Sequence, residues 1–138
     1  MPTDPAVELI YRERIPLNES ALRAIRTRIR GFAPLLGDQT QNALLAANEL
    51  ASAFLRYGEA DTFEIRLYAG EDRFRVELLD SMLSEANLTA PKDDEGALRL
   101  KVLEAVTNRW GVLGDGISVV WFEVRRGAVA AAELSREM

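Results

Sequence analysis

The sequence contains neither cysteine nor histidine. Without cysteine, the protein can form no disulfide bond and has no thiolate nucleophile. Without histidine, it has no imidazole to serve as a general base near neutral pH or as a metal ligand. Any proton transfer by this protein would therefore depend on a carboxylate, a lysine or a tyrosine.

Long apolar runs are also missing, and no stretch approaches the length needed to cross a membrane. The first five residues, Met1 to Pro5, lack the basic and apolar regions of a secretory leader. The net charge of −5 gives no sign of the basic surface on which general nucleic-acid binding depends. We therefore expect a cytoplasmic protein that binds neither membranes nor nucleic acids.

What the sequence does contain is typical of a single globular domain. Its 138 residues are enough to bury a core, and 48% of them are hydrophobic and 28% charged. We expect the core over residues 7–124 and a short terminal helix over residues 128–138. We find no internal repeat and no second domain.

The longest helical pattern runs from Asp38 to Gly58. Asp38 followed three positions later by Gln41 forms a capping box, and Gly58 is a typical C-terminal stop. Between these ends, apolar residues recur at three- and four-residue spacing and predict one buried stripe, made of Leu44, Ala47, Ala51, Phe54 and Leu55. Glu49 and Ala53 lie on a neighbouring face, so one carboxylate stands beside the core stripe.

A second helical pattern, over residues 18–36, begins at Asn18, which is a favourable N-cap residue. Its apolar stripe consists of Leu22, Ile25, Ile29, Phe32 and Leu36. Another face of the same helix carries Arg23, Arg26 and Arg30. This face can dock an acidic partner, or it can be an ordinary solvated helix surface, and the sequence leaves both interpretations open.

Alternation of apolar and polar residues predicts a β-hairpin over residues 62–79, with a turn at residues 69–72. Further patterns outside the hairpin predict strands at 7–15, 110–112 and 117–124 and a helix at 98–109. Together they predict an α/β (α+β) fold, a two-layer sandwich. We expect a mixed, mostly antiparallel sheet covered on one face by three helices, which begin near Asn18, Asp38 and Ala97.

The run from Glu49 to Tyr57, Glu-Leu-Ala-Ser-Ala-Phe-Leu-Arg-Tyr, resembles the N-box helix of the GHKL ATPase superfamily, in particular the anti-sigma-factor serine kinases of bacterial partner switching. In that family the glutamate is the general base, and an asparagine four residues later holds Mg²⁺ against the ATP phosphates. Glu49 matches the base, whereas the asparagine position is Ala53, whose methyl group cannot coordinate a hard cation. Asn48 points to a different side of the helix and does not replace the asparagine.

The resemblance covers residues 7–124 and implies a Bergerat-like fold, a histidine-kinase-like ATPase domain. Order and spacing of the elements carry it, together with the helix end Arg-Trp-Gly at residues 109–111 and the strand Val-Trp-Phe-Glu at residues 120–123. Residues 81–96 correspond to the flexible nucleotide lid of the family. Such a long segment is either a functional loop or a disordered one, and the sequence does not separate the two.

Two further nucleotide motifs of the family are altered. The adenine-reading aspartate of the family's Asp-x-Gly-x-Gly motif corresponds to Asp80, but in Asp80-Ser81-Met82-Leu83-Ser84 the two glycine positions are occupied by Met82 and Ser84. The phosphate-gripping Gly-x-Gly corresponds to Ala97-Leu98-Arg99, with Gly96 just before it. Arg99 is thus the remaining candidate for a phosphate contact. The same segment can also be an ordinary helix N-terminus that binds no phosphate.

The combined changes imply a degenerate member of the family, a regulatory protein that binds a protein partner in a partner-switching system, with ATP binding lost and no cofactor. By resemblance the partner is a sigma factor or an anti-sigma antagonist, and the family also allows a homodimer. The alternative is an active protein serine kinase that uses ATP and Mg²⁺, with Glu49 as general base, Asp80 at adenine and Arg99 at phosphate. A third interpretation, a structural or dimerisation module without a signalling role, remains open.

Overall fold

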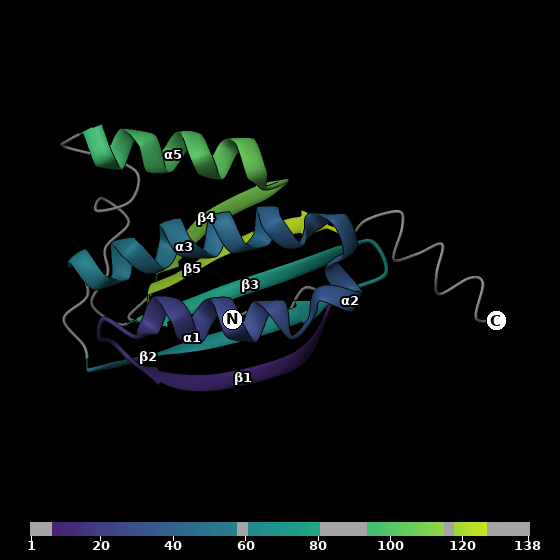
Figure 1. The fold of residues 1–138 in the computed structure, drawn as a ribbon, viewed down its shortest axis with the longest axis horizontal. Coiled ribbons are helices and arrows are strands. Elements are labelled where there is room, and N and C mark those ends of the chain that lie inside the picture. Colours follow the sequence, from purple (N-terminus) through teal and green to yellow (C-terminus); the bar gives the residue numbers. More distant parts are fainter. Residues whose placement is uncertain (1–6, 58–60, 81–93, 115–117, 127–138) are drawn as a thin grey trace.

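The computed structural model describes residues 7–57, 61–80, 94–114 and 118–126, so the predicted helix over residues 128–138 lies outside them. Strands form one layer, and the helices α1, α3 and α5 lie side by side across one face of the sheet (Figure 1). In chain order the elements are β1 (Glu8–Pro16), α1 (Ala21–Arg30), α2 (Ala33–Leu36), the 3-10 turn η1 (Gly37–Gln39), α3 (Thr40–Tyr57), β2 (Thr62–Ala69), β3 (Arg73–Asp80), α5 (Asp94–Val106), β4 (Arg109–Gly114) and β5 (Ser118–Arg125).

The five-stranded sheet has the order β1-β2-β3-β5-β4. Each pair of neighbouring strands in the described part of the chain is antiparallel. β2 and β3 form the predicted hairpin, whereas β5 inserts between β3 and β4. The predicted two-layer α+β sandwich is confirmed, and it is consistent with a Bergerat-like fold.

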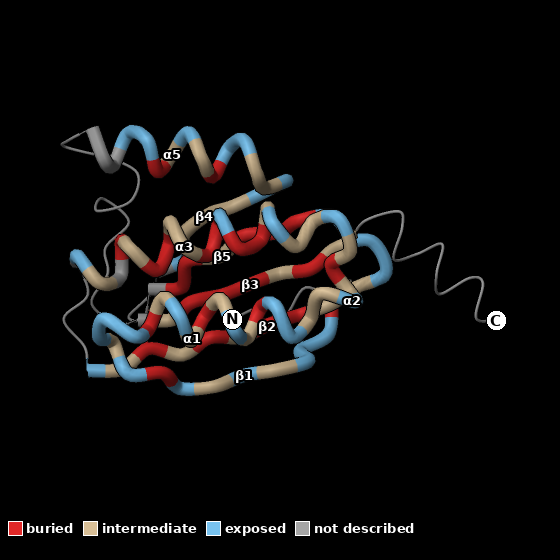
Figure 2. Tube along the Cα trace, in the orientation of Figure 1, coloured by how far each residue is buried: buried red, intermediate tan, exposed pale blue. Residues whose placement is uncertain are grey.

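Alternation along the strands decides which side chains enter the core. In β2 the residues Phe63, Ile65 and Leu67 are buried, and the strands β3 and β5 contribute alternate residues in the same way. Figure 2 shows that the buried segments face each other across the two layers. The helix α1 adds Ile25 and Ile29 to this core.

The predicted α3 stripe is confirmed at Leu44, Ala47 and Ala51, which are buried, and Leu55 is partly buried. The side chain of Phe54 is not among those that the structure describes. Burial extends further around the helix than predicted, because four more residues of α3 are also in the core, namely Ala43, Ala46, Leu50 and Ala53, whereas Leu45 is exposed. α3 is covered on several sides because it lies between α1 and α5 and above the sheet.

Helices α1 and α3 begin near Asn18 and Asp38, as predicted, but neither residue is the N-cap of its helix. Asn18 does not cap α1, because its side chain accepts hydrogen bonds from the backbone N–H and the hydroxyl of Ser20, and the helix follows this turn. Asp38 lies in η1, and α3 begins at Thr40, whose hydroxyl donates to the carbonyl of Gly37. The single helix predicted over residues 18–36 is divided into α1 and α2.

The third helix, α5, also has different bounds from those predicted. It begins at Asp94, ahead of Ala97, and ends at Val106. Leu98 is 59% exposed, whereas Leu103 is fully buried, so the side of α5 that carries Leu103 faces the core.

Candidate functional site

The two α3 positions that matter for metal and base chemistry differ in burial. Ala53 is fully buried in the core, whereas Glu49, one turn earlier, is partly exposed. A metal-binding asparagine in place of Ala53 would have to put its amide among packed apolar side chains. The general-base candidate is therefore nearer the surface than the position of the metal ligand, and the roles of both residues stay predictions.

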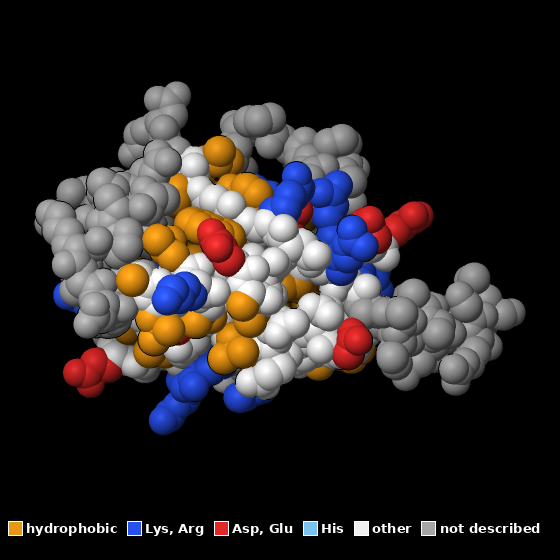
Figure 3. Space-filling model, turned by 90° about the horizontal axis from the view of Figure 1, so that it is seen from above, with side chains coloured by type: hydrophobic (Ala, Val, Ile, Leu, Met, Phe, Trp, Pro, Cys, Tyr) orange, Lys and Arg blue, Asp and Glu red, His pale blue; other side chains and the backbone are white. Residues whose placement is uncertain are grey.

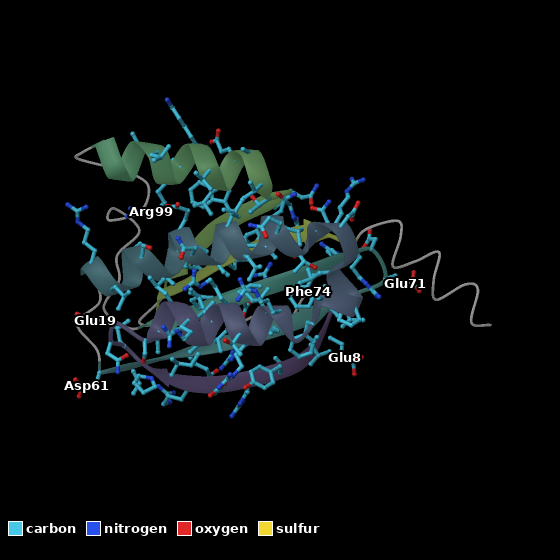
Figure 4. All side chains as sticks on the ribbon, viewed as in Figure 1. Glu8, Glu19, Asp61, Glu71, Phe74 and Arg99 are labelled. Atoms are coloured by element: carbon cyan, nitrogen blue, oxygen red, sulfur yellow. The ribbon has the colours of Figure 1, made fainter. Side chains whose placement is uncertain are left out.

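Arg99 on α5 is one of the largest buried side chains, with 1% of its surface exposed. Figure 4 shows that it lies between α5 and α3. The family resemblance aligns this position with a phosphate-loop glycine, where backbone N–H groups need open space in front of them. A phosphate would have to enter the interface between the two helices to reach Arg99, and the phosphate contact stays a prediction.

The other residues of the predicted nucleotide site are described only in part. The backbone of Asp80 forms the last pair between β3 and β5, opposite Ser118, but its side chain is outside the described set. Gly96 lies within the first turn of α5 and not before the helix. Residues 81–93 of the predicted lid lie outside the described residues, while Asp94–Gly96 belong to α5. The adenine and lid assignments therefore stay predictions.

Two of the three arginines predicted to share a face of α1 line the same pocket. Arg23 and Arg30 are exposed, and Arg26 is partly buried. A pocket of about 370 Å³ on this helix is lined by Glu19, Ser20, Leu22, Arg23 and Arg26, without Arg30. The Nε atom of Arg26 is buried and has no hydrogen-bond partner among the residues that the structure describes. A buried donor without an acceptor costs free energy, which an acceptor supplied from outside would recover.

Arg28, on the same helix, is held by β1. Its Nε donates to Glu13 Oε1 at 2.5 Å and to the Tyr11 hydroxyl at 3.1 Å, and its Nη2 donates to Glu13 Oε2 at 3.1 Å. The hydrogen bonds from Arg28 lower the pKa of Glu13, and the neighbouring Glu13 raises the pKa of Tyr11. Arg28 therefore ties α1 to β1 and does not contribute to the exposed arginine face.

A polar network that the sequence analysis missed lies on the face of the sheet away from the helices. Its centre is Glu123 on β5, whose side chain is 3% exposed. Guanidinium groups of Arg73, Arg75 and Arg109 donate to this carboxylate at 3.4, 3.2 and 2.9 Å. These arginines belong to the neighbouring strands β3 and β4, so the network joins three strands.

The network continues along β3 to Glu77, which is 2% exposed. Glu77 accepts from Arg75 at 2.8 Å and from the Tyr68 hydroxyl at 3.0 Å. Burial, reinforced by the charge of Glu77, raises the pKa of Tyr68. Arg75 also lies 4.1 Å above the ring of Trp121, a cation–π contact. The alternation of β3 gave the polar positions, but only the strand register reveals that they meet β5.

Within residues 7–57, 61–80, 94–114 and 118–126, no group of three or more Asp or Glu side chains is placed to hold a metal ion. The buried carboxylates Glu77 and Glu123 are instead paired with arginines. None of the described helices is long and apolar enough to cross a membrane.

No protein-family model matches the sequence, and no curated protein matches it either. Among solved structures, the chain is similar to the crystal structure of the RsbU and RsbW domains of Rv1364c from Mycobacterium tuberculosis, with a TM-score of 0.61 and 13% sequence identity. The match covers 84% of this chain and 32% of that chain, so the present chain spans about a third of the solved one. The similarity is one of fold, and this fold is the one that the sequence resemblance implied.

Proposed function

We propose that the chain is a regulatory protein of the anti-sigma-factor type, which acts in the cytoplasm by binding a protein partner and not by consuming ATP. The shared fold supports this proposal, because the similar structure includes an RsbW domain, the anti-sigma-factor kinase domain of partner switching. The sequence resemblance over residues 7–124 points to the same family. A sigma factor or an anti-sigma antagonist is the expected partner.

The burial of two residues supports the loss of nucleotide chemistry. Ala53 offers no oxygen to Mg²⁺ and is fully buried. Arg99 places a long side chain where the family has a glycine, and this side chain is buried at the interface of α5 with α3. The alanine removes a ligand for Mg²⁺, and the arginine fills space that an ATP phosphate would need. These two changes favour partner binding over ATP turnover as the function.

The observation that carries the docking proposal is the buried Nε atom of Arg26, for which the described part of the chain supplies no acceptor. Arg26 lines a pocket together with the exposed Arg23. Guanidinium groups bind carboxylates through parallel hydrogen bonds, so an acidic side chain of a partner would satisfy Arg26 and pair with Arg23 at once. We therefore place the docking site for an acidic partner surface at this pocket and include Arg30 only as a flanking charge.

Binding kinetics with a captured partner test this proposal. The partner is first co-purified with the tagged protein from its native cytoplasm and then identified. The double variant Arg23→Glu/Arg26→Glu should associate with it at least tenfold more slowly and with a weaker dependence on salt, because charge steering is reversed. The matched control is Arg12→Glu/Lys101→Glu, which makes the same change in net charge at exposed positions on β1 and α5. Equal association rates for the two double variants would contradict the docking site.

The second candidate function is an active serine kinase, and the observation that favours it is the partial exposure of Glu49, which leaves a carboxylate within reach of a substrate. Phosphoryl transfer depends strongly on metal ions and positioned donors, so the alanine at position 53 weighs against this candidate. Glu49→Ala separates the two functions. Unchanged partner capture is expected for the binding module, whereas a phosphorylated serine on the partner that requires Glu49 would establish the kinase.

A further inference from the structure

A pocket of about 360 Å³ opens on the sheet at the end where β3 begins and β5 ends. Its lining includes three arginines, Arg73, Arg109 and Arg125, together with Asn108 and Glu123. Figure 3 shows Lys and Arg side chains gathered beside acidic ones at the end of the molecule that holds these strand ends in Figure 1. This pocket is formed by the polar face of the sheet and is separate from the arginine face of α1.

Strand register places two like charges directly opposite each other at this pocket. Arg73 of β3 pairs with Arg125 of β5, and alternation along each strand directs both side chains away from the core. Like charges directly opposite each other on neighbouring strands destabilise a sheet. In the described part of the chain, the guanidinium of Arg125 makes no hydrogen bond or ion pair that would offset this repulsion. An anion between the strands would offset it.

Neighbouring contacts hold the pocket in shape. The carboxylate of Glu123 fixes Arg73 and Arg109, and the Arg109 guanidinium also lies 5.8 Å from the Trp121 ring centroid. Asn108 is fixed through its backbone, which donates to the Glu123 carbonyl at 2.9 Å, and through its side-chain oxygen, which accepts from the Arg125 backbone N–H at 2.7 Å. The amide NH₂ of Asn108 is then left as a donor at the pocket. A site arranged in advance loses little entropy when a ligand binds.

We propose that this pocket binds a phosphate group carried by a small molecule. Three arginines line it against two carboxylates, and the side chain of one of these, Asp72, is 86% exposed to solvent. The pocket therefore keeps a positive surplus. Its donors come from β3, β4, β5 and the residue before β4. A phosphate can accept from several directions with its three oxygens, whereas a carboxylate offers two oxygens in one plane.

The test is a titration of the full ¹⁵N-labelled protein with sodium phosphate at constant ionic strength, followed by NMR. The backbone amides of Asn108 and Arg125 should shift together and saturate with a dissociation constant on the order of 1 mM. Arg125→Ala removes one charged donor, and Asn108→Asp keeps the oxygen that binds the Arg125 N–H but replaces the amide donor by a charge. Each variant should bind phosphate roughly tenfold more weakly.

Arg12→Ala is the matched control, since Arg12 is an exposed arginine on β1, at the opposite edge of the same sheet. It should leave the dissociation constant unchanged, and circular dichroism should show that all variants are folded. Binding that is unaffected by both Arg125→Ala and Asn108→Asp, or weakened equally by Arg12→Ala, would overturn the proposal. Equal affinity for acetate at the same ionic strength would overturn the assignment to phosphate.

Discussion

Replacement of Glu123 by alanine should destabilise the folded protein by about 3 kcal/mol. The carboxylate is 3% exposed and accepts hydrogen bonds from Arg73, Arg75 and Arg109. Removal of one member of a buried ion pair costs about 3–5 kcal/mol, because the other member loses its counterion while it stays shielded from water. Arg109 is 56% exposed and can be hydrated after the change, and Arg75 keeps its contact with Glu77, so the lower end of this range applies.

Chemical denaturation measures this effect as a change in the free energy of unfolding. For a domain of this size, about 3 kcal/mol also corresponds to a fall of about 10 °C in Tm. Glu8→Ala is the matched control, because Glu8 is an exposed glutamate on β1, and it should change stability by no more than about 0.5 kcal/mol. A cost below about 1 kcal/mol for Glu123→Ala would refute the reasoning, since the ion pairs would then behave like solvent-exposed ones.

Three further substitutions have definite expected outcomes. Arg28 lowers the pKa of Glu13 in the folded protein, so the stabilisation by this charge is present above the ordinary value of 4.5 and is lost as the pH falls through the lowered value. The Tm difference between wild type and Glu13→Gln should therefore shrink below this pH, and a difference that persists in acid would contradict the explanation. Gly111→Ala should displace the Trp121 ring, since an added Cβ would lie 3.1 Å from its atoms, and an unchanged tryptophan emission spectrum would count against this. Ala53→Asn should lower the free energy of unfolding by about 2 kcal/mol, because its amide enters the core, and calorimetry should detect no gain of ATP binding.

The sequence predicted those parts of the fold that depend on residues close together in the chain. The hairpin of β2 and β3 could be predicted because apolar residues alternate on both sides of a turn. The position of β5 between β3 and β4 could not, because it depends on pairing between residues far apart in the sequence. The N-cap of α1 was misassigned because the side chain of Asn18 accepts hydrogen bonds from Ser20 in a turn, and a residue preference alone does not distinguish such a turn from a cap.

Contacts of the candidate site that join distant parts of the chain could likewise not be predicted from the sequence. Helical spacing placed Arg23 and Arg26 on one face, which the structure brings together at a pocket, but it also included Arg30, which lies beyond that pocket. The burial of Arg99 could not be anticipated, because a charged residue is normally expected at the surface and its cover comes from another helix. The surroundings of Glu123 depend on strand register, which a single sequence does not fix.

Isothermal titration calorimetry of the purified protein with ATP, with and without Mg²⁺, tests most directly whether this protein acts by binding alone. We predict no Mg²⁺-dependent binding tighter than roughly 100 μM, because Ala53 supplies no metal ligand and Arg99 is buried at the place of a phosphate-loop glycine. The wild-type protein should give the same heats with and without Mg²⁺. Mg²⁺-dependent binding tighter than that limit would contradict the binding-module account and favour the kinase.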